Sequence, residues 1–371
     1  MNNHPKIALL KQEVYQDLYV CPTTEKDPAA ILFSSMGRVG PIGLMAELNA
    51  DFYIIKEEDN YETQIYRKVI PRIANDLQLL KTQTLDKLPG QEFKCPGSPF
   101  PNGKFATDCR KIDWSTYDIV ISVNVSLPTE IVMQYPHTLF AYMIGEANLA
   151  TGSAHFGYDV TLNQMARGIV ATRCGKVDFP YTFIGGHTLE NILCNYLRRP
   201  SQRKGIFMEI NSTTERPVTH YPLHFEPLAK AGHNIILHKQ KIADNLQSIY
   251  DAKYFVKWGG RTIRGNSVAE AVSLGALAIM NRNEVIHKEL IIDECHITSM
   301  DELKNLIGLL EQDHELYERL RTKQRTVLQN LFFDRPLRSL ENCLQEKRQC
   351  KSRRRYTWLD QCFDRLCFIR P

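Results

Sequence analysis

The chain has 371 residues, of which 43% are hydrophobic and 24% are charged, a composition typical of globular proteins that excludes a disordered or fibrous chain. Its length predicts two domains, and none of its apolar runs reaches the roughly 20 residues that span a bilayer. The opening stretch MNNHPKIALLKQEVYQDLYV lacks the basic segment and cleavage site of a secretory signal, so we expect a cytoplasmic protein.

The net charge of +4 is unevenly distributed. Residues 335–371 carry ten Lys or Arg and four Asp or Glu, a charge of +6 that leaves −2 for the rest of the chain. The body therefore has no excess of positive charge that would favour nucleic acid as a partner. None of the ten cysteines is spaced as Cys-x-x-Cys, which predicts reduced thiols with no disulfide and no metal site.

The first half of the chain predicts strands that alternate with helices. Short apolar runs bounded by polar residues are typical of buried strands. We expect a helix within residues 62–80 and a loop at 88–105, where Pro and Gly are dense. The predicted strands are residues 6–10, 29–35, 51–59, 118–124 and 137–145.

The pattern restarts after a predicted helix at 189–198 and a polar stretch that contains Pro200. Strands spaced by helices of this length imply parallel sheets. We therefore predict an α/β fold of two Rossmann-like parallel-sheet domains in tandem, facing a cleft: an acceptor-side domain at 1–198, a donor-binding domain at 204–330 and a basic helical tail at 331–371. In the second half the predicted strands are 205–211, 233–239, 253–258 and 276–281, and the helices are 224–232, 245–252, 267–275 and the long region 299–333.

The stretch WGGRTIRGNSVAEAVSLGALAIM, residues 258–280, suggests a ligand site. Ligands of open parallel sheets bind at the carboxyl ends of strands, over helix N-termini whose free amides favour phosphate. Arg261 and Arg264 can add charge-assisted hydrogen bonds, and Asn266 or Ser267 is the expected N-cap. Glu270 lies one turn further, where a carboxylate can accept two ribose hydroxyls. A capping box of Ser267 and Glu270 also fits this spacing, but explains neither the arginines nor the glycines.

The segment GNSVAEAVSLGALAIM resembles the donor-side signature of GT-B-fold glycosyltransferases. The resemblance implies that the loop and the helix N-terminus hold the nucleotide diphosphate and that Glu270 holds the ribose. Many retaining members of that group carry a second glutamate eight residues earlier. Thr262 occupies this position here, which favours an inverting reaction. Other polar residues that follow predicted strands and are expected on the donor side are Arg216, His238 and Lys239.

The first half offers a candidate base. Glu146 follows the predicted strand 137–145 directly, and a carboxylate placed there can take a proton from an acceptor hydroxyl. The sequence around it, GEAN, also resembles the acceptor-side stretch of bacterial α-1,3-fucosyltransferases, in which such a glutamate is the proposed base. A loop carboxylate that binds backbone amides is the structural alternative. Further residues expected on the acceptor side are Arg38, His155 and Asp159.

The sequence thus predicts a metal-independent, cofactor-free glycosyltransferase that moves a sugar from a nucleotide-sugar donor to a hydroxyl of a glycan or lipid-linked acceptor. Two alternatives stay open: a non-catalytic protein that binds a sugar or a nucleotide, and a nucleotide-sugar epimerase of related fold.

The C-terminal tail allows a peripheral membrane contact, in which basic residues meet anionic lipid and Trp358 and Phe363 enter the interface. It also fits a closing helix that packs back on the first domain.

Overall fold

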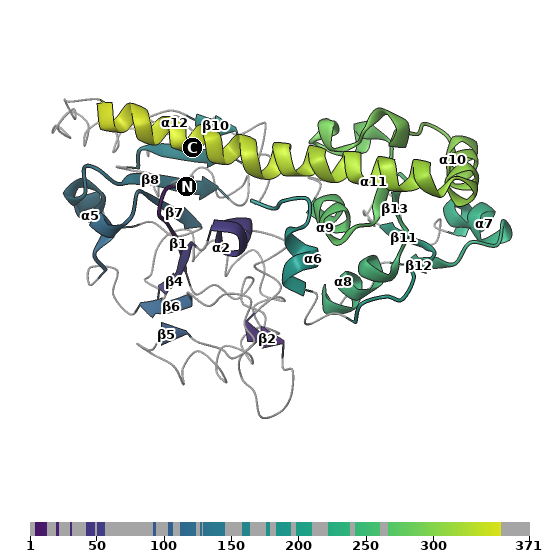
Figure 1. The fold of residues 1–371 in the computed structure, drawn as a ribbon, viewed down its shortest axis with the longest axis horizontal. Helices are drawn as coiled ribbons and strands as arrows, with labels where there is room; N and C mark the ends of the chain where they lie inside the picture. Colours follow the sequence, from purple (N-terminus) through teal and green to yellow (C-terminus); the bar gives the residue numbers. More distant parts are fainter. Residues whose placement is uncertain are drawn as a thin grey trace, which may run out of the picture. The chain divides into compact units, whose positions relative to one another are not determined.

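A computed structural model of the chain forms two units, which are described one at a time (Figure 1). The first comprises Met1–Thr182 with Pro336–Pro371, and the second comprises Phe183–Arg335. The structure describes residues 4–12, 20–21, 30–31, 42–48, 50–55, 92–93, 103–106, 112–123, 127, 129–144, 158–163, 176–178, 183–193, 198–209, 222–237, 242–259 and 266–349.

The first unit contains an eight-stranded sheet in the order β10-β9-β8-β7-β1-β4-β6-β5. All neighbouring strands are parallel except β5 and β6. Apolar residues of β1, β7 and β8 pack with Trp114 and with α5, Thr129–Gln134, in one buried cluster. The strands are β1 Ile7–Gln12, β4 Asp51–Ile55, β5 Glu92–Phe93, β6 Gly103–Ala106, β7 Ile119–Val123, β8 Leu139–Ile144, β9 Val160–Asn163 and β10 Lys176–Asp178.

One sequence prediction in this unit needs correction. Residues 103–106, expected in a loop, form β6, because parallel pairing with β4 outweighs the local turn preference of Pro and Gly. Of the predicted strand 29–35, the structure describes two residues. These residues, Ala30–Ile31, form β3, which pairs antiparallel with β2, Val20–Cys21. The helix expected within 62–80 lies outside the described residues, and the short helix α2 spans Ile42–Leu48.

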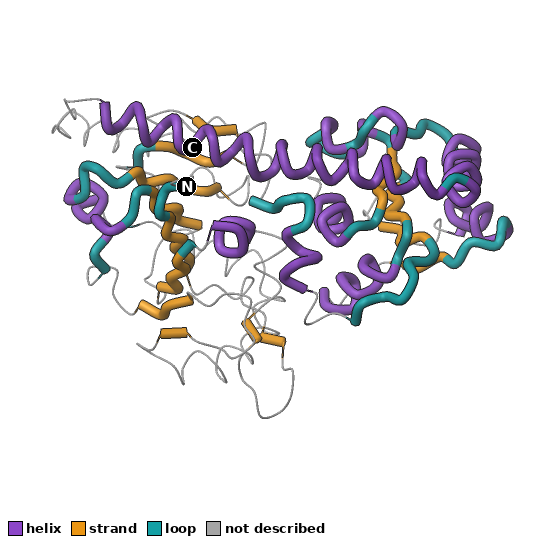
Figure 2. Tube along the Cα trace, in the orientation of Figure 1, coloured by secondary structure: helices purple, strands orange, loops and turns teal. Residues whose placement is uncertain are grey.

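The second unit contains a four-stranded, fully parallel sheet in the order β12-β11-β13-β14. Its strands are β11 Ile206–Glu209, β12 Ile235–Leu237, β13 Tyr254–Lys257 and β14 Leu277–Met280. The connecting helices are α7 Pro222–Lys230, α8 Ile242–Asp251 and α9 Asn266–Leu274 (Figure 2). All eight residues of β13 and β14 are buried, and all but Lys257 are apolar, as is typical of strands in a parallel sheet. The two parallel sheets confirm the predicted α/β fold.

The long helical region predicted at 299–333 contains two α-helices. Helix α10, Met300–Gln312, ends at Asp313, whose carboxylate then accepts the Leu316 amide and caps α11, His314–Gln329. A single π-helical turn, Asn330–Asp334, joins α11 to α12, Arg335–Gln349. Helix α12 belongs to the first unit, where Arg348 pairs with Asp118 at the start of β7.

The second unit begins at Phe183, before α6. Helix α6, Thr188–Leu193, belongs to the second unit because Ser273 of α9 holds its beginning. The Ser273 hydroxyl donates to the Gly185 carbonyl at 2.9 Å and accepts the Leu189 amide at 2.8 Å. A polar side chain buried inside α9 thus links the two helices, a contact that the helical pattern alone does not predict.

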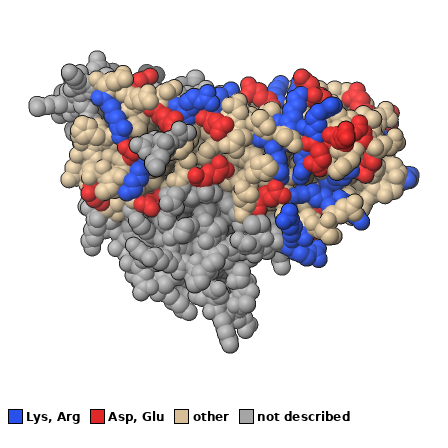
Figure 3. Space-filling view, viewed as in Figure 1, with Lys and Arg blue, Asp and Glu red and all other residues tan. Residues whose placement is uncertain are grey.

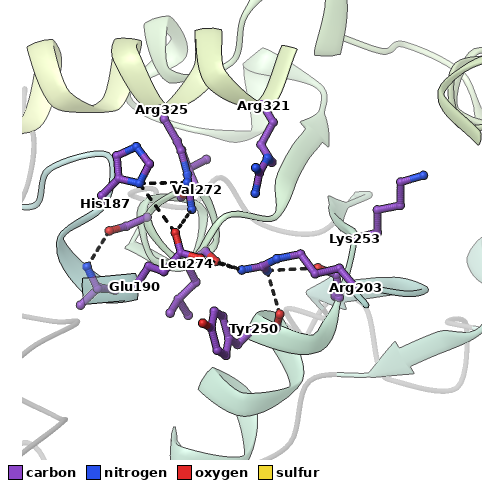
Figure 4. Close-up of polar contacts among 12 residues, drawn as sticks. His187, Glu190, Arg203, Tyr250, Lys253, Val272, Leu274, Arg321 and Arg325 are labelled. Atoms are coloured by element: carbon purple, nitrogen blue, oxygen red, sulfur yellow. Dashed lines mark hydrogen bonds and ion pairs between the residues drawn. The ribbon is translucent and has the colours of Figure 1, made fainter. Parts of the chain in front are cut away.

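A cluster of buried charges fixes the C-terminal end of α9 (Figure 4). Arg325 of α11 donates to Glu190 of α6 at 2.5 Å and to the Val272 carbonyl at 3.3 Å. Arg203 donates to the Leu274 carbonyl and, at 3.4 Å, to Glu190. Cations suit the negative end of the helix dipole. Gly275 follows with a φ of +92°, and a Cβ there would lie 2.3 Å from an Arg325 nitrogen.

Gln324 of α11 closes the outer edge of β14. Its side-chain oxygen accepts the Ala278 amide at 2.8 Å, and its side-chain nitrogen donates to the Ala278 carbonyl at 3.0 Å. The amide group therefore takes the place of a further strand, and it is fully buried.

We expect the change Gln324→Met to lower the free energy of unfolding by about 2 kcal/mol, because it leaves the buried Ala278 N–H and C=O without partners. Urea denaturation followed by circular dichroism measures this loss. Thr326→Ala on the exposed side of α11 is the control and should change stability by less than about 0.5 kcal/mol. Equal stability of Gln324→Met and the wild-type chain would contradict the role given to this side chain.

Candidate functional site

The candidate site lies at the carboxyl edge of the four-stranded sheet of the second unit. Strand β11 ends at Glu209 and β13 ends at Lys257, and these two residues are direct neighbours in the parallel register. Helix α9 begins at Asn266, after the loop that leaves β13. This is the arrangement in which an open parallel sheet binds ligands, with strand ends and a helix N-terminus at one edge.

Ser267 in the first turn of α9 donates its hydroxyl hydrogen to the carboxylate of Glu209. Because α9 already includes Asn266, Ser267 lies within the helix rather than at the N-cap position before it. Its hydroxyl therefore connects α9 to the end of β11, and the simple capping box does not describe this contact. Sequence reasoning did not select Glu209, because the predicted strand 205–211 runs two residues past the observed end of β11.

Lys257, Gly259 and Glu284 form a closed ring of contacts beside this edge. The Lys257 ammonium donates to the Gly259 carbonyl at 2.6 Å and to Glu284 at 3.0 Å. The second oxygen of Glu284 accepts the Gly259 amide at 2.9 Å. The side chain of Lys257 is 0% exposed, so its charge depends on these partners. Gly259 has a φ of +69°, a conformation that L-residues rarely adopt.

Glu270 lies one helical turn after Ser267, so the two residues share one face of α9. Its side chain is partly exposed and takes part in an interaction within the protein. It is thus placed close to the helix N-terminus, where a carboxylate can accept hydrogen bonds from the hydroxyls of a ligand. This placement follows the sequence prediction, while the role given to Glu270 stays a prediction.

Two carboxylates accompany Lys257 at this edge: Glu284 binds its ammonium group, and Glu209 is its neighbour in the strand register. Among the residues expected to bind phosphate, the side chain of Asn266 lies outside the described part of the structure. The cations proposed for that role lie there as well, in the segments that follow β11, β12 and β13: Arg216, His238, Lys239, Arg261 and Arg264.

Elsewhere on the second unit, acidic and basic side chains are interspersed over the face that Figure 3 shows. Several are paired, as Lys323 is with Glu294 and Arg321 with Glu318. On that face the described residues present no broad patch of one charge.

In the first unit, Glu146 follows the carboxyl end of β8 by two residues and lies outside the described residues, as do Arg38 and His155. Asp159 is described, and it precedes β9 at the amino end of that strand. Its carboxylate accepts the Phe140 amide at 2.8 Å and binds the Lys347 ammonium of α12. Ligands of parallel sheets bind at the opposite ends of the strands. These contacts hold α12 against the sheet of this unit, and the acceptor-side role of Asp159 stays a prediction.

Within the described ranges, no group of three or more His, Cys, Asp or Glu side chains converges as metal ligands would. Among the helices of the same residues, none combines the length and the apolar sequence required to cross a membrane.

The helical part of the tail, α12, contacts the rest of the first unit through Lys347 and Arg348. Residues 350–371 lie outside the described part.

Comparisons with known proteins give likenesses of structure at low identity. No protein-family model and no curated protein sequence matches the chain. The glycosyltransferase SnogD from Streptomyces nogalater shares 9% identity, with 93% of this chain and 100% of that chain covered and a TM-score of 0.40. Sucrose-phosphate synthase from Thermosynechococcus elongatus shares 10%, with 94% and 100% covered and a TM-score of 0.37. A UDP-N-acetylglucosamine 2-epimerase shares 10%, with 94% and 98% covered and a TM-score of 0.38. Values this low support no inference about the function of this chain.

Proposed function

We propose that this chain is a glycosyltransferase whose second unit binds a nucleotide-sugar donor. The observation that supports this most directly is the carboxyl edge of the four-stranded sheet, where Ser267 and Glu270 of α9 lie beside the end of β11. A helix N-terminus at such an edge favours the phosphates of a nucleotide, and Glu270 is one turn away, where it can accept the ribose hydroxyls.

The proposed reaction is a single inverting displacement. Glu146 takes the proton from an acceptor hydroxyl while the acceptor oxygen forms a bond to the anomeric carbon of the sugar. The bond between that carbon and the diphosphate oxygen breaks at the same time. Arg261 and Arg264, together with the amides at the start of α9, stabilise the charge on the leaving diphosphate.

We propose that Asn266, Arg216, His238 and Lys239 add contacts to the donor, with no metal required. Arg38 and His155 are proposed to contact the acceptor, a glycan or a lipid-linked sugar.

A thermal-shift screen of UDP, GDP, ADP, CDP and their sugar conjugates, with and without a chelator, tests the donor site. A nucleotide at about 100 times its dissociation constant should stabilise the protein by about 2.7 kcal/mol. A stabilisation by one nucleotide family that EDTA does not alter would support a metal-independent donor site. No stabilisation by any of them would contradict the proposal, and turnover of a nucleotide sugar without an acceptor would favour an epimerase.

The change Glu270→Ala should weaken binding of the stabilising nucleotide by about 10- to 100-fold, because a hydrogen bond to a charged group contributes about 1.5–3 kcal/mol. Isothermal titration calorimetry measures the affinity, and the 2′-deoxy form of the same nucleotide should bind the wild-type chain more weakly for the same reason. Glu315→Ala, in the first turn of α11, is the matched control and should bind as the wild type does. Unchanged affinity in Glu270→Ala would remove Glu270 from the donor site.

A further inference from the structure

His187 lies in the turn immediately before α6 and contacts two charged side chains of the cluster at the end of α9 (Figure 4). Its Nδ1 atom lies 2.9 Å from Nη1 of Arg325 and 3.7 Å from the carboxylate of Glu190. A guanidinium group can only donate hydrogen bonds, so Nδ1 accepts this one. The imidazole ring is therefore neutral in this arrangement, and its single N–H is at Nε2.

A proton on Nδ1 of His187 is incompatible with this contact. An imidazolium ion donates at both nitrogens and accepts at neither, so Arg325 would lose an acceptor and face a second cation. The oxygen of Glu190 that lies 3.7 Å from Nδ1 is also the one that binds Arg325, at 2.5 Å. The charged ring therefore competes with Arg325 for the same carboxylate oxygen.

The exposure of the two cationic partners decides which of them moves. The side chain of His187 is 61% exposed, so its ring can take up a proton and turn, whereas that of Arg325 is 8% exposed and held by the Val272 carbonyl. The other charged side chains on the described elements around this pair lie before β11, on α6, on α11 and in the π-helical turn. They are Arg203, Glu190, Arg321 with its partner Glu318, and Asp334.

The turn that carries His187 fits closely against α11. The Gly186 amide donates to the side chain of Gln329 at 3.0 Å, and a Cβ atom on Gly186 would lie 2.5 Å from the Arg325 carbonyl oxygen. With so little space between the two backbones, a change of partner at His187 acts directly on the contact between this turn and α11.

We propose that His187 is a pH-dependent switch: the neutral ring binds Arg325 and holds the turn before α6 on α11, and the charged ring leaves Arg325 for Glu190 and loosens that turn. Histidine changes charge between about pH 5 and 8. Glu190 stays ionised over this range: burial raises its pKa, but Arg325 and Arg203 lower it below the ordinary 4.5. The switch lies within the second unit and does not depend on the proposed function.

NMR spectroscopy of the full chain with ¹⁵N-labelled histidine tests the change of partner. The signals of His187 are those missing from the spectrum of His187→Gln. At about pH 8 they should show a proton on Nε2 and none on Nδ1, and at about pH 5.5 a proton on both nitrogens. A proton on Nδ1 at pH 8 would overturn the proposal, because the ring could not then accept from Arg325.

Amide exchange at Gly186, compared at equal pH between the wild type and His187→Gln, tests the loosening. Glutamine stays neutral and offers an acceptor at either pH, so the two proteins should exchange alike at about pH 8. At about pH 5.5 the wild type should exchange about tenfold faster. His314→Gln, which alters a histidine at the start of α11, is the control and should keep the acid response of the wild type. Equal exchange in the wild type and His187→Gln at both pH values would show that His187 does not act on this turn.

Discussion

Replacing Glu190 by glutamine is expected to lower the free energy of unfolding of the second unit by about 3–5 kcal/mol, because it leaves two buried arginines without their counter-charge. The side chains of Arg203 and Arg325 are 14% and 8% exposed, so water cannot replace the lost carboxylate. Their remaining hydrogen-bond partners are neutral. They include the carbonyls at the end of α9, the Tyr250 carbonyl, which accepts from Arg203 at 2.7 Å, and Nδ1 of His187, which accepts from Arg325 at 2.9 Å.

The same carboxylate predicts how stability depends on pH. Burial alone would raise the pKa of Glu190, but Arg325 and Arg203 lower it below its ordinary value of 4.5. A group whose pKa is lowered by folding stabilises the folded state fully above its unfolded pKa. This contribution is lost as the pH falls through the lower, folded-state pKa. The difference in stability between the wild type and Glu190→Gln should therefore be largest above pH 4.5 and shrink in more acidic solution.

Urea denaturation followed by circular dichroism, repeated at several pH values, measures both effects. Glu318→Gln is the control, since Glu318 pairs with Arg321 one turn away on α11 and is 40% exposed, and it should cost less than about 1 kcal/mol. If Glu190→Gln and Glu318→Gln lose similar amounts of unfolding free energy, other groups must balance the charges of Arg203 and Arg325, and the role given to Glu190 is wrong.

The change Glu146→Gln should reduce kcat by about 10²- to 10⁴-fold, because the amide cannot take the proton from the acceptor hydroxyl. Glutamine has the same shape as glutamate, so binding of the donor should not change. Initial rates of sugar transfer, measured with the nucleotide sugar and the acceptor that the screens identify, give kcat, and calorimetry gives the affinity for the nucleotide.

The control for this change is Glu130→Gln, which alters an exposed glutamate in the first turn of α5 of the same unit. It should keep the wild-type rate. A wild-type rate in Glu146→Gln would exclude Glu146 as the base and transfer that role to another acceptor-side group such as His155. A loss of nucleotide affinity that matches the loss of rate would instead point to a role in binding.

The fold was largely predictable because its signal is local. The apolar runs at 118–124, 253–258 and 276–281 are buried strands, and Gly232 and Gly275 end helices with positive φ as expected. Strand β6 was missed because four residues beside Pro101 carry too little apolar pattern, and only their partner β4 makes them a strand. The contact between α6 and Ser273 could not be predicted, because it joins residues 84 positions apart.

The candidate site was predictable in its position but not in its contacts. The strand ends and the start of α9 could be derived from the alternation of elements, which placed Ser267 and Glu270. The partners Glu209, Lys257 and Glu284 come from three separate segments of the chain. No short motif joins them, because their proximity depends on the strand order β11-β13-β14 and on the turn that follows β14.

The amide of Gln324 has a consequence for the behaviour of the protein in crowded solution. An open strand edge is a template on which another chain can add a strand and begin to aggregate. On β14 the Ala278 groups are already satisfied by Gln324, and Met280 forms an isolated bridge with His296. The opposite edge, β12, is only three residues long. A sheet closed by a side chain on one edge and shortened on the other gives an approaching strand few hydrogen-bonding groups to bind.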